Sequence, residues 1–240
     1  MFLNLDTALH LFITSMTNVL CCNSNIDILY CMLNQLSLSE IVVLFIAILI
    51  SMVVHEACHG YVAYWLGDNT ALEHGRLTFN PLKSIDLLTT ILLPMVLVLF
   101  GLMPFFAAKP VPINPRNLKF GNYGSALVGV AGPISNLLMA VVVGLFLRFL
   151  GAGFSPFFQS VFIIFIEVNI GLFIFNMIPF PPLDGSRLLY AFAPEFIQEI
   201  MLRIESFGFF SILIFMLLVL QFIITPISNI ELGLLKLIIG

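Results

Sequence analysis

The sequence predicts an all-α polytopic membrane protein, a bundle of about five to six transmembrane helices with a re-entrant segment and short extended edge pieces. Of its 240 residues, 60% are hydrophobic and 9% are charged, whereas soluble domains carry about 25% charged residues. A membrane-spanning helix needs about 20 mostly apolar residues. Windows that meet this requirement lie at 38–66, 87–108, 124–150, 157–178 and 207–226, with a weaker window at 7–22.

The weak N-terminal window is expected to be a retained first helix. Residues 1–20 contain no Lys or Arg, and polar residues interrupt the apolar run. A secretory signal peptide has a basic flank before its apolar segment. Four cysteines are too few for a disulfide framework, although a bond between Cys31 and Cys21 or Cys22 stays open.

Window 87–108 is predicted to be re-entrant, entering and leaving on one side. Two prolines and a glycine interrupt it, and the backbone groups that proline frees need partners inside a bilayer. Seven basic residues then share one face, which the positive-inside rule marks as cytoplasmic. A spanning segment would instead divide the nine basic residues five to four. The seven are Arg76, Lys83, Lys109, Arg116, Lys119, Arg187 and Arg203.

The connecting stretches 67–86 and 109–123 hold most of the polar residues. Within them, 75–81 and 109–115 are predicted to be short extended pieces that end in proline. We divide the chain into an N-terminal helix and loop (1–37), a membrane core (38–190) and a C-terminal transmembrane helix with a tail (191–240). The formal net charge of −4 leaves no basic surface for nucleic acid.

Chemistry concentrates in the segment His55-Glu56-Ala57-Cys58-His59, an HExxH motif. Helix positions i and i+4 share one face, so both imidazoles can reach one zinc ion while the glutamate acts as general base. The alternative is a pair of hydrogen-bonded core histidines. It is the weaker interpretation, because three ionisable residues in an apolar helix are costly unless they pair, bind an ion or line a wet cavity.

A catalytic zinc site needs a third protein ligand and an open position. The candidates are His10, His74, Glu167 and Asp184. With a re-entrant 87–108, the helix that carries the two histidines and the helix at 157–178 end on the same face. Asp184 follows the second of these helices, so the topology favours it.

Two motifs together resemble the site-2 protease family of intramembrane zinc metalloproteases. They are the HExxH and the segment 176–185, in which an asparagine precedes a proline-rich turn and Asp-Gly. Segments 75–82, 108–115 and 131–136 resemble its compact bacterial branch, which lacks a PDZ domain. The resemblance covers roughly residues 40–190. One departure is Ser84-Ile85-Asp86-Leu87, where this branch commonly has a histidine before Ile-Asp-Pro.

Carried over residue by residue, the resemblance implies that His55, His59 and Asp184 hold one Zn²⁺ per chain and that Glu56 activates water. It implies a metalloendopeptidase that hydrolyses a peptide bond within or near a transmembrane helix of a membrane-protein substrate. The setting is the lipid bilayer of a bacterial inner membrane, with the active site toward the cytoplasm. The oligomeric state stays open.

The resemblance also implies that Asn176 contacts the substrate or an intermediate. Asn136 either assists there or forms an amide hydrogen bond between helices. The extended pieces either add an unwound substrate segment as an edge strand or are simple connectors. Glu167 lies outside the matched motifs, and its role stays open.

Two other classes of function remain as alternatives. A transporter or ion-binding protein could use the buried His, Glu and Asp residues as its site, but it would usually show paired repeats, which are not evident in this sequence. A non-cleaving relative could bind membrane helices, but all three ligands and the base are present.

Overall fold

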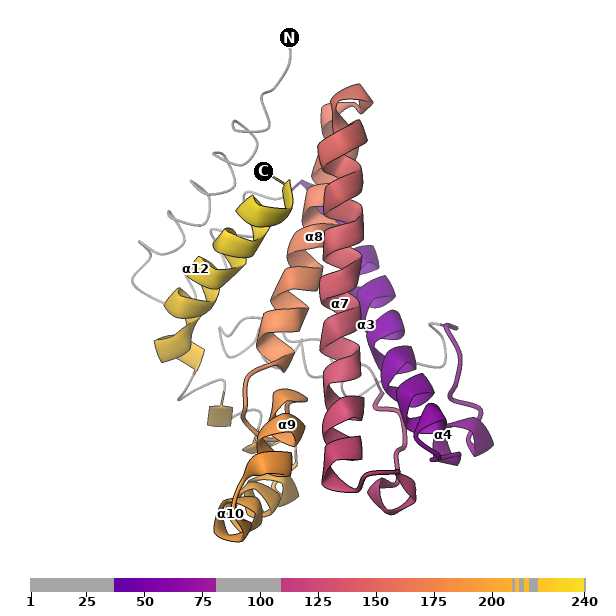
Figure 1. Cartoon of the computed structure of the whole chain (residues 1–240). Helices are drawn as coiled ribbons and strands as arrows, with labels where there is room; N and C mark the ends of the chain where they lie inside the picture. Colours follow the sequence, from indigo (N-terminus) through magenta and orange to yellow (C-terminus); the bar gives the residue numbers. More distant parts are fainter. Residues whose placement is uncertain (1–36, 81–108, 209, 212–213, 216–219, 240) are drawn as a thin grey trace.

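The computed structural model describes residues 37–80, 109–208, 210–211, 214–215 and 220–239. Within these residues every regular element is a helix and there is no strand (Figure 1), which confirms the all-α fold class. The helices are α3 (Leu38–Trp65), α4 (Thr70–Glu73), η2 (Pro115–Asn117), α7 (Asn122–Leu150), η3 (Gly151–Gly153), α8 (Pro156–Asn176), α9 (Gly185–Phe192), α10 (Glu195–Ser206) and α12 (Leu220–Ile239).

Three helices among the described residues are long and apolar enough to cross a membrane: α3, α7 continued by η3, and α8. They match the predicted windows 38–66, 124–150 and 157–178. They lie side by side, with α7 packed against both α3 and α8. The predicted windows 7–22 and 87–108, and the cysteine pairing near Cys31, lie outside the described residues.

The C-terminal region differs from the expectation of a helix over 207–226 followed by a tail. The tail is helical, because α12 continues to Ile239. Ile238 and Leu235 of this part lie in the apolar core with Leu147 of α7 and Ile166 of α8. The predicted window ended at residue 226 because Glu231 and Lys236 lower the mean hydropathy of the residues that follow. The helix continues there because its apolar side chains pack against α7 and α8.

The last turn of α3 and the first turn of α7 lie at the same end of the bundle. The amide of Lys119, just before α7, donates to the carbonyl of Leu66, just after α3, at 2.8 Å. The Arg76 side chain donates to the carbonyl of Lys109 at 2.7 Å. The described residues on both sides of 81–108 therefore meet at this end.

Asp68 ties the two connecting stretches together at that end. Its carboxylate is fully buried and accepts hydrogen bonds from the amide of Asn114 at 2.7 Å, the side chain of Asn117 at 3.1 Å and Thr70. The pieces 75–80 and 109–114 belong to no helix or strand. They pass beside α3 as irregular connectors held by these side-chain contacts.

Candidate metal centre

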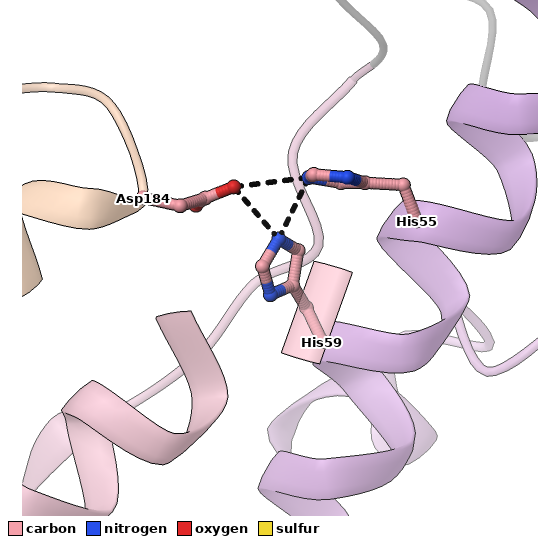
Figure 2. A group of neighbouring side chains, drawn as sticks. All are labelled: His55, His59 and Asp184. Atoms are coloured by element: carbon pink, nitrogen blue, oxygen red, sulfur yellow. Dashed lines mark hydrogen bonds and ion pairs between the residues drawn. The ribbon is translucent and has the colours of Figure 1, made fainter. Parts of the chain in front are cut away.

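Three side-chain atoms converge between α3 and the start of α9 (Figure 2). The Nε2 atoms of His55 and His59 lie 3.0 Å apart. The Oδ2 atom of Asp184 lies 3.0 Å from the first and 3.2 Å from the second. Both histidines are buried. Among the described residues, this is the group of His, Cys, Asp or Glu side chains able to hold a metal ion.

The turn after α8 brings Asp184 to the histidines. Asp184 directly precedes α9, whose first residue is Gly185. A Cβ atom on Gly185 would overlap the backbone carbonyl of Met177, so the Asp-Gly pair permits this tight return. α9 then packs on α7, where Arg187 lies against Gly129.

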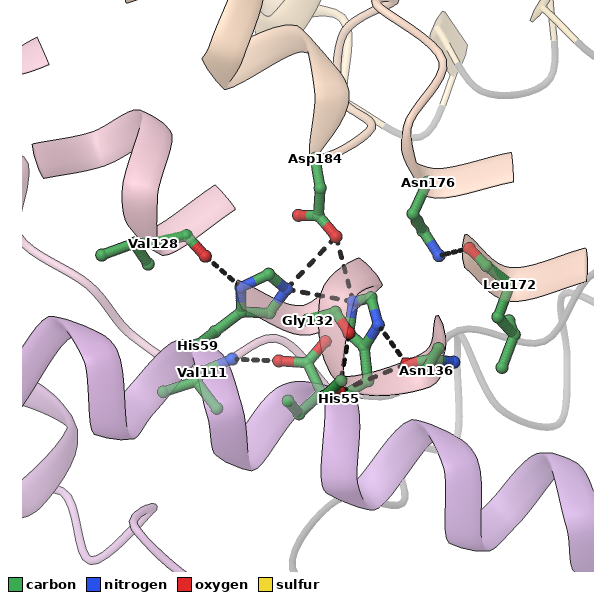
Figure 3. Close-up of polar contacts among 11 residues, drawn as sticks. His55, His59, Val111, Val128, Gly132, Asn136, Leu172, Asn176 and Asp184 are labelled. Atoms are coloured by element: carbon green, nitrogen blue, oxygen red, sulfur yellow. Dashed lines mark hydrogen bonds and ion pairs between the residues drawn. The ribbon is translucent and has the colours of Figure 1, made fainter. Parts of the chain in front are cut away.

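Both imidazoles are oriented by hydrogen bonds at their other ring nitrogen (Figure 3). His59 Nδ1 lies 2.6 Å from the carbonyl of Val128, an atom that can only accept, so the proton sits on Nδ1. His55 Nδ1 lies 3.0 Å from the Oδ1 atom of Asn136, which is fully buried. With both protons at Nδ1, each Nε2 presents a lone pair to Asp184, the usual arrangement of metal-ligating histidines.

An aspartate carboxyl is ionised at neutral pH, so Asp184 presents its Oδ2 atom to the two imidazoles as part of an anion. A carboxylate and two imidazole lone pairs therefore face one another. Three electron-rich atoms this close repel unless a cation lies between them.

The spacing of the three atoms fits zinc. Zinc bonds of 2.0–2.1 Å in tetrahedral geometry separate ligand atoms by roughly 3.3 Å, close to the observed 3.0 to 3.2 Å. Gly132 of α7 faces this space. A Cβ atom there would lie 2.6 Å from His55 Nε2 and closer still to His59 Nε2. The glycine thus keeps room beside the ligand atoms.

Glu56 lies between the two histidines in sequence and is held by the backbone of another segment. The amide of Val111 donates to the Oε2 atom of Glu56 at 3.0 Å. The connector 109–114 therefore lies beside the metal centre. Pro110 and Pro112 flank Val111 and have no amide hydrogen, so Val111 is the donor at this point of the connector.

Known proteins resemble the chain over most of its length. It is 38% identical over 195 residues to the Bacillus subtilis (strain 168) protein named "Putative zinc metalloprotease YwhC", covering 78% of this chain and 85% of that protein. The chain belongs to this family of zinc metalloproteases. Zinc is therefore its metal, and His55, His59 and Asp184 form a group that could hold a metal ion.

A second relative in the family is "Putative zinc metalloprotease Rip2" of Mycolicibacterium smegmatis (strain ATCC 700084 / mc(2)155). It is 28% identical over 183 residues, which cover 75% of this chain and 66% of that protein. The Rip2 protein of Mycobacterium tuberculosis (strain ATCC 25618 / H37Rv) is 26% identical over 146 residues, 59% of this chain and 53% of its own. No family model and no solved structure matches the chain.

Neither His74 nor Glu167, both singled out in the sequence, belongs to the group of three converging side chains. Asn176, at the end of α8, donates to the carbonyl of Leu172 in its own helix at 2.9 Å. His74 bonds the carbonyl of Thr70 at 2.8 Å on the exposed surface. Glu167 lies within α8 and is not in the metal-binding group. His10 lies outside the described residues.

Three contributors to the site were not predicted from the sequence: the Val128 carbonyl, the Val111 amide and Gly132. The first two are backbone groups, so residue type gives no signal for them. Gly132 carries a partial signal, since it lies in Ala131-Gly132-Pro133 within an apolar window. A glycine inside a helix often marks a close approach of another element.

Proposed function

We propose that the chain is an intramembrane zinc endopeptidase of the site-2 protease type, similar to the compact bacterial branch without a PDZ domain. Its substrate would be a transmembrane protein cut within or near its membrane helix. The supporting observation is the convergence of three atoms that could bind a metal, two of them from α3, a helix apolar enough to span a bilayer. Family membership supplies the class of reaction.

In this proposal, His55, His59 and Asp184 hold the zinc ion. When bound, zinc acts as a Lewis acid that polarises a carbonyl and acidifies water. Glu56 takes a proton from the attacking water and passes it to the amine nitrogen that leaves. A C–O bond forms, the peptide C–N bond breaks, and no further reactant is needed.

The Val111 amide has a defined part in this chemistry. It binds Oε2 of Glu56, which fixes the carboxylate plane and leaves the other oxygen for the proton. We assign the connector 109–114 this positioning role. We do not propose that substrate adds to this connector as a strand. Pro110 and Pro112 have no amide hydrogen to donate to a substrate, and the Val111 amide already donates to Glu56.

The substrate and its approach follow from the depth of the site. A helical substrate hides its peptide bonds in its own hydrogen-bond ladder, so it must unwind locally before a carbonyl can reach the metal. We propose that Asn176 contacts this unwound segment, since α8 ends beside the turn that carries Asp184. The basic residues near this end favour a cytoplasmic orientation in a bacterial inner membrane.

The decisive experiment compares Glu56→Gln with Glu73→Gln in proteoliposomes that contain a single-pass helical substrate. Glu73 lies on the exposed helix α4 and serves as the matched control. The proposal expects Glu56→Gln to retain zinc and lose cleavage by a factor of about 10² or more, with Glu73→Gln unchanged. Cleavage at the wild-type rate by Glu56→Gln would refute Glu56 as the base.

The same preparation separates the proposal from its alternatives. A transporter would move zinc or another ion into the vesicles, and it has no need for a general base. A non-cleaving relative would hold zinc and bind the helix without producing fragments. Fragment analysis and vesicle ion uptake, measured together, distinguish the three.

A further inference from the structure

We infer that α10 and the end of α9 lie in the plane of the membrane–water interface, with an apolar edge inserted among the lipids. This surface is at the end of the bundle that holds the metal centre. The inference does not depend on the proposed protease activity. Only its consequence for Asp184 rests on that proposal.

The residue pattern of α10 is that of an interfacial helix. Phe196 and Ile200 lie on one edge, with Phe207 continuing this edge just past the helix, and Phe196 and Phe207 are 64% and 63% exposed. The neighbouring stripe contains Met201, which is buried. Glu205 lies on the opposite side of the helix from Phe196, because nine residues correspond to two and a half turns.

The length and charge of α10 exclude a transmembrane orientation. Its 12 residues span about 18 Å, whereas the hydrocarbon core is about 30 Å thick. It also contains Glu195, Glu199, Arg203 and Glu205. Arg203 comes seven residues after Phe196 and therefore borders the apolar edge. A short helix whose apolar edge is bordered by charged residues is typical of helices that lie in the interface.

The exposed apolar surface is continuous with a membrane-spanning helix. Phe192, the last residue of α9, is 69% exposed, and its ring lies 5.5 Å from that of Tyr123 in an edge-to-face contact. Tyr123 lies in the first turn of α7, which is long and apolar enough to span the membrane. The apolar surface of α9 and α10 therefore begins where α7 leaves the bilayer.

Exposed aromatic residues indicate that this end of the helix bundle lies at the membrane–water interface. Tyr64 and Trp65 at the end of α3 are exposed, as are Phe120 and Tyr123 at the start of α7. The hydrogen bond from Lys119 to Leu66 places these two helix ends together. Exposed Trp and Tyr gather at membrane–water interfaces, so lipid, rather than a second protein, is the occupant that this rim indicates.

The interfacial surface is joined to the metal centre. The Gln198 side chain of α10 donates to the carbonyls of Tyr190 and Ala193 at 3.1 and 3.0 Å, which links α10 to α9. α9 begins directly after Asp184. Lipid contact along α10 would therefore help to hold the third zinc ligand in place.

Fluorescence quenching tests the surface directly. Trp65 is the single tryptophan, so Trp65→Phe gives a background into which Phe196→Trp, Ile200→Trp or Glu205→Trp is introduced. Each full-length variant is placed in vesicles of phosphatidylcholine with or without brominated acyl chains. Aqueous iodide is the opposing quencher, and neither zinc nor a substrate is needed.

We expect brominated lipid to remove about half of the emission at positions 196 and 200, with little effect of iodide. Position 205 should show the reverse. The inference is overturned if iodide quenches position 196 as strongly as position 205. It is also overturned if neither quencher reaches positions 196 and 200, because another protein chain would then cover this surface.

Discussion

The backbone of Gly132 lies directly against the imidazole of His55. A Cβ atom at this position would come within 2.6 Å of the Nε2 atom of His55, and it would meet His59 as well. α7 thus approaches α3 at the point where the side chains of His55 and His59 leave the helix.

Replacing Gly132 with alanine should therefore abolish most zinc binding. The added methyl group would push both imidazoles away from the Oδ2 atom of Asp184. Zinc content of the purified variant, measured by atomic emission, checks this. Gly233→Ala is the matched control, because nothing lies within 4 Å of its added Cβ. Wild-type zinc content in Gly132→Ala would contradict the close approach described here.

Asn136 should act through His55 rather than through the substrate. Asn136→Leu removes the acceptor of the His55 Nδ1 proton, and loss of such partners weakens metal affinity about 10- to 100-fold. Asn136→Asp keeps an acceptor oxygen and should retain near-normal affinity. Competition with a chelator measures both variants. Equal zinc affinity in the leucine and wild-type proteins would remove this role.

The Val111 amide can be deleted without changing Glu56 itself. Val111→Pro removes the hydrogen that binds Glu56 Oε2, and we expect cleavage to fall by about one to two powers of ten with zinc retained. Val111→Ala keeps the amide and should cleave normally. The comparison is made by rate in proteoliposomes. If the two variants cleave equally well, the amide does not position the base.

Asp68 should contribute a pH-dependent part of the stability. Burial raises the pKa of the Asp68 carboxyl, but hydrogen bonds from Thr70, Asn114 and Asn117 outweigh this, and the pKa lies below its ordinary value of 3.8. A pKa lowered by folding stabilises the protein at pH values above the unfolded-state pKa. That contribution declines as the pH falls through the folded-state pKa.

Asp68→Asn should accordingly lower the free energy of unfolding by about 1–3 kcal/mol at pH 7. The difference from wild type should shrink below pH 3.8. Thermal unfolding in detergent at several pH values measures it, with Glu73→Gln as the exposed control. A difference that does not vary with pH would show that the Asp68 charge is not responsible.

The sequence predicted the helices and the paired histidines, because both depend on residues that are close together in the chain. Apolar windows located α3, α7 and α8, because a membrane helix must be apolar along its whole length. The HExxH spacing placed two ligands on one face, and topology pointed to Asp184. The structure brings these three together, although their roles as ligands remain a prediction for experiment.

Contacts between distant segments were beyond local pattern. The bond from Val111 to Glu56 joins residues 55 positions apart, and that from Val128 to His59 joins residues 69 apart. Both use backbone atoms that every residue type shares. The last part of α12 was missed because its stability comes from packing on α7 and α8, which hydropathy alone does not register.

Zinc stoichiometry tests the central claim most directly, and it needs no knowledge of the substrate. Detergent-purified wild type should hold about one zinc ion per chain, and Glu56→Gln should hold the same amount. Asp184→Ala should lose most of its zinc, because only two of the three converging atoms remain. A wild-type protein without zinc, or an Asp184→Ala variant that keeps a full equivalent, would contradict the account.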